Sequence, residues 1–535
     1  MKGVNNVKNL NLDHKILWPV LVILLLVLVP IGINPSAAEN IVGTTLDFIT
    51  SNFGWLYLLF PFAILVFFIW ILFGRLGRTK LGDPDDKPEF STFSWFAMIF
   101  TTGIAAEIMY ESIMEPLHFF NGPPFGIEPE TLSAAEWAIP YSFFHWGILT
   151  WAIYALPSIP IAYALYIKKI PYLKLSAVCR PILGKHSDGI VGKIIDIITI
   201  VGLIGVVGTS IGLVAPMVAR FIGELFNIPV TFGLLVIVIA LWVIIFGTSV
   251  YVGLNKGIKR LSNFNIILVI VITAFVFIAG PTIFMLDNSI HSLGTMLSNF
   301  FQMGLNLDPI RNEGFPQTWT VFYWAWWIGY AALIGLFTAR VSKGRTIRQM
   351  ILAQCLLGPV GCWVFFSVYG NYGLHLQLFE SIPLTSILVE EGATDAVVAV
   401  MNSLPFSTII IALLIVVYLI FSATTFDAAS FILASMSSKK LDNMGQPPRI
   451  QRLFWAFVLG LVGIFILYIG GLEAVQLASV VVGVPMILVF ALVTISFIKT
   501  VREDFGKNKS TYTKGNQIAD QEEDIYVEKG RNINK

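Results

Sequence analysis

Twelve stretches of about 20 mostly apolar residues recur along the 535-residue chain, and each is long enough to cross a bilayer as a helix. They cover residues 16–33, 54–74, 95–120, 140–167, 194–222, 230–252, 262–286, 319–340, 350–371, 407–435, 453–471 and 475–498. Hydrophobic residue types make up 56% of the chain and charged ones only 13%, which is more apolar surface than a soluble fold can bury. The pattern predicts an all-α integral membrane protein with twelve transmembrane helices.

Lysine and arginine alternate from loop to loop. They gather before the first span and after every second one, in the segments 2–15, 75–87, 168–185, 256–260, 340–348, 439–452 and 499–502. The intervening loops 35–53, 121–139, 372–406 and 472–474 contain neither residue, and the loop 287–318 contains only Arg311. Because basic loops stay in the cytoplasm, the alternation predicts a multi-pass protein of the bacterial inner membrane with both termini cytoplasmic.

The loops divide the chain into five regions. Residues 1–90 hold the N-terminus and two leading spans, 91–286 and 319–498 hold five spans each, 287–318 is an outer loop, and 499–535 is a cytoplasmic tail. A unit of five spans used twice must insert in opposite orientations, so an inverted repeat of five and five is expected. The outer loop contains an amphipathic stretch, 290–303, expected to lie along the membrane interface. The tail is mixed in charge and is expected to be disordered, and its lack of a basic run gives no support to docking on anionic lipid.

Two segments are unusually rich in tryptophan. The span at 319–340 opens with WTVFYWAWW and continues to Tyr330, so its aromatic residues surround most of the helix and extend well past the interface where tryptophan usually lies. The second segment, 143–154, begins the span at 140–167. At 100° per residue on one helix, Trp146 and Trp151 lie about 140° apart with Tyr154 between them, so Trp146 and Tyr154 are the better pair to face one ligand.

Such aromatic groups suit one class of solute in particular. A quaternary ammonium has no N–H group to donate, so a protein holds it by cation–π contact with aromatic faces, and tryptophan offers the strongest face. The two segments therefore predict a transporter with an aromatic cage for a quaternary-ammonium substrate.

Four phrases of the sequence resemble the betaine/choline/carnitine transporter family: WTVFYWAWW (319–327), ARVSKGRTIRQ (339–349), FHWGILTWAIYA (144–155) and PPFGIEP (123–129). The resemblance extends from about residue 90 to the last span. It implies a twelve-helix, LeuT-like inverted repeat, a homotrimer, and a secondary transporter that imports glycine betaine, carnitine or choline for osmoprotection. The aromatic box that it implies consists of Trp146, Trp326, Trp327 and Tyr330 with Tyr154 nearby, and His118 falls where carnitine antiporters place a tyrosine.

Members of this family differ in the ion that drives them. Phe421 followed by Thr424 and Thr425 resembles the sodium motif of the symporters, with Thr101 and Ile104 of the third span as the opposite wall. Equally, threonine pairs in spans often bond back to their own helix carbonyls.

The position of the antiporters' substituting arginine is Asn265 here, which leaves the site short of a positive charge, as bound Na⁺ would require. Na⁺ symport is therefore favoured, with proton-coupled choline-type uptake and cation-independent exchange as alternatives.

The third span departs from the family pattern. Symporters have a glycine-rich phrase there, whereas only Gly103 remains in this chain, so an unwound stretch is less expected. Glu107, Glu111 and Glu115 follow at a spacing of four, which places them on one helix face. A carboxylate costs about 2.5–3.5 kcal/mol at mid-bilayer, so this acidic stripe predicts a proton relay or a counter-charge. Alternatively, some of these acids lie near a helix end and pair with interior polar groups.

Other classes of function receive less support. The six histidines show no i, i+4 pair and no HExxH phrase, so an integral membrane enzyme is less expected than a transporter, and no cofactor or metal other than Na⁺ is predicted. The three cysteines lack metal-ligand spacing and are expected to be small apolar fillers. A net charge of +1 without a basic tail argues against nucleic acid as a partner.

Overall fold

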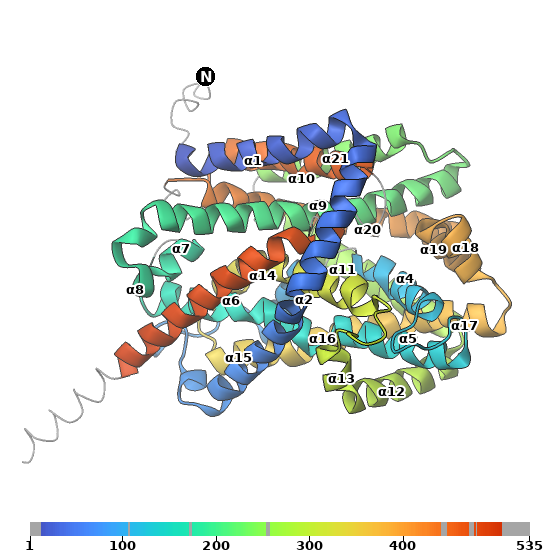
Figure 1. The fold of residues 1–535 in the computed structure, drawn as a ribbon, viewed down its shortest axis with the longest axis horizontal. Helices are drawn as coiled ribbons and strands as arrows, with labels where there is room; N and C mark the ends of the chain where they lie inside the picture. Colours follow the sequence, from blue (N-terminus) through green and yellow to red (C-terminus); the bar gives the residue numbers. More distant parts are fainter. Residues whose placement is uncertain are drawn as a thin grey trace, which may run out of the picture.

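The computed structural model describes residues 12–104, 107–170, 174–252, 257–439, 447–469, 476–477 and 479–505. Over these residues the fold is helical, and its only β-type pairings are two isolated bridges, Leu12 to Ser438 and Lys80 to Thr346 (Figure 1). Among the described residues, eight helices are long and apolar enough to cross a membrane, or up to ten if each of two bent helix pairs counts as one span. All twelve predicted stretches fall largely on helical residues, but the count of twelve spans and the inverted repeat remain predictions.

The helices follow one another along the chain with short connections. The α-helices of the first part are α1 His14–Ile33, α2 Pro35–Phe73, α3 Thr92–Gly103, α4 Glu107–Asn121, α5 Leu132–His145, α6 Ile148–Tyr166, α7 Leu175–Val178, α8 Arg180–Leu183, α9 Ile190–Phe226, α10 Phe232–Val252, α11 Gly257–Ala279, α12 Thr282–Ser298 and α13 Phe300–Leu305. Those of the second part are α14 Val321–Val341, α15 Ile347–Leu352, α16 Gly358–Phe365, α17 Asn371–Phe379, α18 Leu384–Glu390, α19 Ala393–Asn402, α20 Ser407–Met436, α21 Arg449–Ile469 and a last helix, Ser479–Phe505. Short 3₁₀ turns are η2 Leu76–Arg78 and η3 Gly184–Ser187, and π-helical turns are η4 Pro316–Thr320, η5 Ala353–Leu357 and η6 Phe366–Gly370.

Helix α14 lies in the middle of the molecule. The apolar window of its span is 94% buried, against 39% for the span that ends α2. It packs along α6 and also contacts α9 and α3, while α2 crosses the outside of the group (Figure 1). Neighbouring helices therefore cover most of the aromatic side chains of α14.

Two helix breaks lie close to this centre. Helix α3 ends at Gly103 and α4 begins at Glu107, and their axes differ by 60°, with residues 105 and 106 outside the described part. The third span is therefore broken, although the loss of the family's glycines made a break less expected. The second break separates α5 from α6 at Trp146 and Gly147. A Cβ on Gly147 would lie 2.5 Å from the Phe143 carbonyl oxygen, so only glycine fits this turn.

The predicted outer loop and tail differ in extent from the structure. The amphipathic stretch belongs to a longer helical segment, α12 and α13, and α12 turns away from α11 by 105°. Helix α12 buries Met285, Ser292 and Met296 and exposes Ile283 and Ile290, so apolar side chains lie on both its buried and its exposed sides. The last helix continues to Phe505, so the first residues of the predicted tail are helical, and residues 506–535 lie outside the described part.

Candidate functional site

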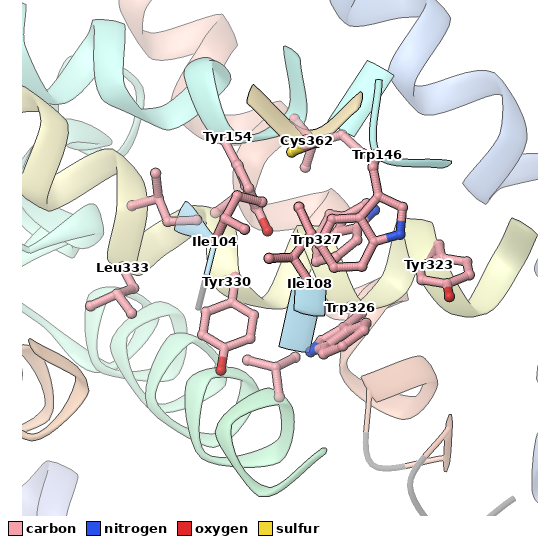
Figure 2. Close-up of a cluster of buried hydrophobic side chains, with 14 of the residues drawn as sticks. Ile104, Ile108, Trp146, Tyr154, Tyr323, Trp326, Trp327, Tyr330, Leu333 and Cys362 are labelled. Carbon is pink, nitrogen blue, oxygen red and sulfur yellow. The ribbon is translucent and has the colours of Figure 1, made fainter. Parts of the chain in front are cut away.

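The two tryptophan-rich segments meet at the centre of the molecule (Figure 2). Trp146 lies at the break between α5 and α6, and its ring centroid is 4.7 Å from that of Trp327 and 6.3 Å from that of Trp326, both on α14. All three side chains are buried, with at most 2% of their surface exposed. The structure therefore brings the predicted box tryptophans together from segments 180 residues apart in the chain.

The tryptophans on α14 are stacked on one another. The rings of Trp326 and Trp327 are nearly parallel, at 11° with centroids 4.9 Å apart. Phe322 stacks one turn before Trp326, at 5.4 Å, and Tyr323 one turn before Trp327, at 5.8 Å. Since other aromatic rings already stack on Trp326 and Trp327, the box is closed.

A small cavity lies beside the stacked rings. It is lined by residues from both halves of the broken third span, from the α5–α6 break, from α14 and from α20: Thr102, Gly103, Ile104, Glu107, Trp146, Trp326, Trp327, Tyr330 and Thr425. Its volume is about 10 Å³, which is room for about one water molecule. A trimethylammonium group is much larger, so the rings have to separate before such a substrate can bind.

The other two predicted substrate residues occupy different places. Tyr154 does not line the cavity, although its ring meets the edge of Trp327 at 5.8 Å. Trp146 and Tyr154 lie on opposite sides of the helix break, so the angle derived for one continuous helix does not apply to them. His118 also lies outside the cavity wall, and its ring contacts Trp319 at 5.0 Å.

The acidic stripe divides into two parts. All three acids of α4 are buried, but only Glu107 lines the cavity. Glu111 accepts a hydrogen bond of 3.1 Å from the Tyr323 hydroxyl, and Glu115 accepts one of 2.7 Å from the Trp146 indole N–H. Glu107 is thus the one acid of the stripe that lines the cavity, while Glu111 and Glu115 are hydrogen-bonded to aromatic side chains.

Two threonines among the predicted sodium ligands donate their hydroxyls to carbonyl groups of their own helices. Thr101 donates to the Ala97 carbonyl at 2.9 Å, and Thr424 donates to the Phe421 carbonyl at 2.7 Å. Of the five predicted ligands, Ile104 and Thr425 line the cavity together, whereas Thr101, Phe421 and Thr424 do not. Over the described part of the chain, no group of three or more His, Cys, Asp or Glu could hold a metal ion. The sodium site therefore stays a prediction.

Sequence reasoning did not assign a role to several buried polar residues around the box. His145 is fully buried, and its Nδ1 lies 2.8 Å from a Glu115 carboxylate oxygen, while Tyr323 holds Glu111. Asp427, in the predicted sodium motif, instead forms a buried ion pair of 3.0 Å with Arg452 of α21. The sequence did offer a signal for the roles of these residues. A polar side chain within an apolar span costs free energy unless it has a partner, so its presence there indicates that it has one.

Comparison with known protein families supplies an independent result. The family described as BCCT, betaine/carnitine/choline family transporter, matches residues 15–506. The match covers nearly the whole chain and includes the two leading spans, where the quoted phrases do not reach.

Proposed function

The chain belongs to the betaine/carnitine/choline transporter family, and we propose that it imports a quaternary-ammonium cation of the choline type through the aromatic box. Membership makes it a membrane-embedded secondary transporter of small quaternary-ammonium solutes and not an enzyme, as the sequence predicted. The choice among choline, glycine betaine and carnitine rests on the charge of the cavity wall. Import, ion coupling and assembly as a homotrimer are part of the proposal.

The observation that carries this proposal is the position of Glu107. Glu107 lines the same small cavity as Trp146, Trp326 and Trp327, and none of the described residues that line the cavity is basic. A betaine or carnitine brings a carboxylate of its own, which an ionised Glu107 would repel. A choline-type cation brings only positive charge, so the aromatic faces and Glu107 attract it together.

One unpartnered polar group of the cavity wall suits the other end of choline. The Trp326 indole N–H is buried and has no hydrogen-bond partner among the described residues. A buried donor without a partner costs free energy, and a substrate oxygen that accepts from it removes this cost. A substrate hydroxyl would serve without adding a second negative charge near Glu107.

Two coupling ions are consistent with this site. Na⁺ coupling is supported by Thr425 and Ile104, which approach one another at the cavity from α20 and the end of α3, and by Asn265, which is neutral where antiporters have an arginine. Proton coupling is supported by Glu107, because a carboxylate that lines the cavity can carry a proton and release it when a cation binds. Exchange without a coupling ion has no comparable support in these residues.

Competition for uptake tests the proposal. Proteoliposomes that contain the purified protein are loaded to give an inward Na⁺ gradient, an inward proton gradient, both or neither, and uptake of labelled choline is measured. Glycine betaine, carnitine and proline betaine are then added as competitors. We expect choline to be taken up with the highest affinity and a single gradient to drive it. Stronger uptake of a zwitterionic betaine than of choline would refute the assignment of Glu107.

A further inference from the structure

We propose that Glu115 and His145 are positioning residues that hold Trp146 in the box and so set the size of the ammonium group that the transporter accepts. The inference rests on the proposed function, because it concerns the same aromatic box. Neither residue lines the cavity, so both act through the tryptophans and not by touching the substrate.

Both oxygens of the Glu115 carboxylate are engaged. Oε2 accepts the Trp146 indole N–H at 2.7 Å, and Oε1 lies 2.8 Å from Nδ1 of His145. Both Glu115 and His145 have no exposed surface. In a buried site of low dielectric constant, a carboxylate that accepts hydrogen bonds in a fixed geometry restrains its donors strongly. The plane of the Trp146 ring is therefore determined by a residue behind it.

His145 links this carboxylate to the start of α14. With Glu115 ionised and His145 neutral, Nδ1 donates to the carboxylate, and Nε2, which lies 3.1 Å from the Thr320 hydroxyl oxygen, accepts from that hydroxyl. Thr320 directly precedes α14, and the His145 ring also stacks on Tyr323 of the first turn, at 4.7 Å. The end of α5 and the start of α14 are thus joined through one imidazole.

The helix break adds a second restraint. Because α5 ends at His145, its backbone carbonyl accepts from outside the helix: the Thr150 hydroxyl donates to it, and so does the Trp327 indole N–H, at 3.1 Å. Trp146 is therefore restrained through Glu115 of α4, and Trp327 through the last residue of α5. Trp326 differs, because its indole N–H has no partner among the described residues and packing alone orients its ring.

This difference predicts how the box opens. The cavity has to grow from about 10 Å³ to admit an ammonium group, and only Trp326 can swing without breaking a buried hydrogen bond. Trp146 and Trp327 then form the two fixed walls, and their separation limits the bulk of the groups on nitrogen. If the hydrogen bond between Trp146 and Glu115 is lost, the Trp146 ring can move aside, and bulkier ammonium groups fit.

The test compares two substrates that differ only in the size of the ammonium group, choline and its N,N,N-triethyl analogue. Initial uptake rates are measured in proteoliposomes at equal amounts of reconstituted protein, and the ratio of kcat/KM for the two substrates is the readout. We expect Glu115→Leu to lower the preference for choline at least tenfold, and Glu115→Gln, which keeps an acceptor for Trp146, to lower it less. Asp196→Asn is the matched control, since Asp196 is also a buried carboxylate but is hydrogen-bonded to Ser176, away from the box.

A second pair of variants keeps the proposal testable if Glu115→Leu does not accumulate in the membrane. His145→Asn retains an N–H donor near Glu115, whereas His145→Phe retains the ring and loses both nitrogens. We expect the preference for choline to fall in the Phe variant and to be largely retained in the Asn variant. An unchanged preference in every accumulated Glu115 and His145 variant would overturn the proposal.

Failure of the proposed function gives a different result. If Trp326→Ala transports choline normally, the box itself is misassigned, whatever the Glu115 variants do. If the parent protein prefers glycine betaine, the same size comparison is made with its N,N,N-triethyl analogue, and the roles of Glu115 and His145 are tested independently of the charge of the substrate.

Discussion

Replacing Glu107 by glutamine removes one charge from the cavity wall and keeps the shape of the side chain. Glu107 lines a cavity together with three tryptophans and no described basic residue, so when ionised it is the charge at the cavity wall that a bound cation meets. At a separation of about 5 Å and an effective dielectric constant of about 20, Coulomb's law gives an attraction of about 3 kcal/mol. Each 1.4 kcal/mol changes affinity tenfold, so Glu107→Gln is expected to weaken choline binding on the order of 100-fold.

The assay is uptake of choline and glycine betaine over a range of concentrations by the parent and by Glu107→Gln. The KM for choline should rise, while that for glycine betaine should stay constant or fall, because the variant no longer repels the substrate carboxylate. Asp196→Asn, which removes a buried charge elsewhere, should change neither. The same KM for choline in Glu107→Gln and in the parent would show that Glu107 carries no charge that the substrate meets, and the argument for a choline-type cation would fail.

Four further outcomes follow from the same geometry. Trp326→Ala and Trp327→Ala should each remove a cation–π face worth about 0.5–2 kcal/mol and open the cage, so uptake should be lost while membrane insertion is retained; near-normal affinity in either would defeat the box. Thr425→Leu should make uptake slow or independent of Na⁺ without loss of substrate binding, and indifference of the parent to Na⁺ would refute the sodium site. Glu111→Gln should alter the pH profile of uptake or the ranking of choline and betaine; if it matches the parent in both, the bond of Glu111 to Tyr323 is structural only. Gly147→Ala should destabilise the purified protein by about 1–3 kcal/mol, seen as a lower Tm in detergent, because its Cβ would lie 2.5 Å from a backbone oxygen; an unchanged Tm would show that the turn can relax.

Sequence reasoning located the helices well and their breaks poorly. Apolar stretches of about 20 residues are a local property, so each of them could be read without knowing its neighbours. The break after Gly103 was judged less expected because a glycine-rich phrase is missing, yet α3 ends there. The break at Trp146 was not foreseen, although Gly147 gave a local signal, and it made the angle argument for Trp146 and Tyr154 inapplicable.

The roles of the buried acids show a similar limit. The spacing of Glu107, Glu111 and Glu115 correctly placed all three on one helix, but it did not show which of them pair with interior polar groups. Their difference depends on what stands opposite each one: the cavity for Glu107, Tyr323 for Glu111, and Trp146 with His145 for Glu115. These partners belong to segments 30 to more than 200 residues away, and no local pattern predicts such pairings.

The sequence by itself determined that this protein is an α-helical membrane transporter of the betaine/carnitine/choline family and that its tryptophans gather in two segments, because hydropathy and short phrases are properties of contiguous residues. Only the tertiary structure decided that the box is closed around about 10 Å³, that Glu107 alone of the acids reaches it, and that Glu115 and His145 hold its walls. These features depend on how helices cross and where they break, and both are set by side chains that pack against one another from distant parts of the chain.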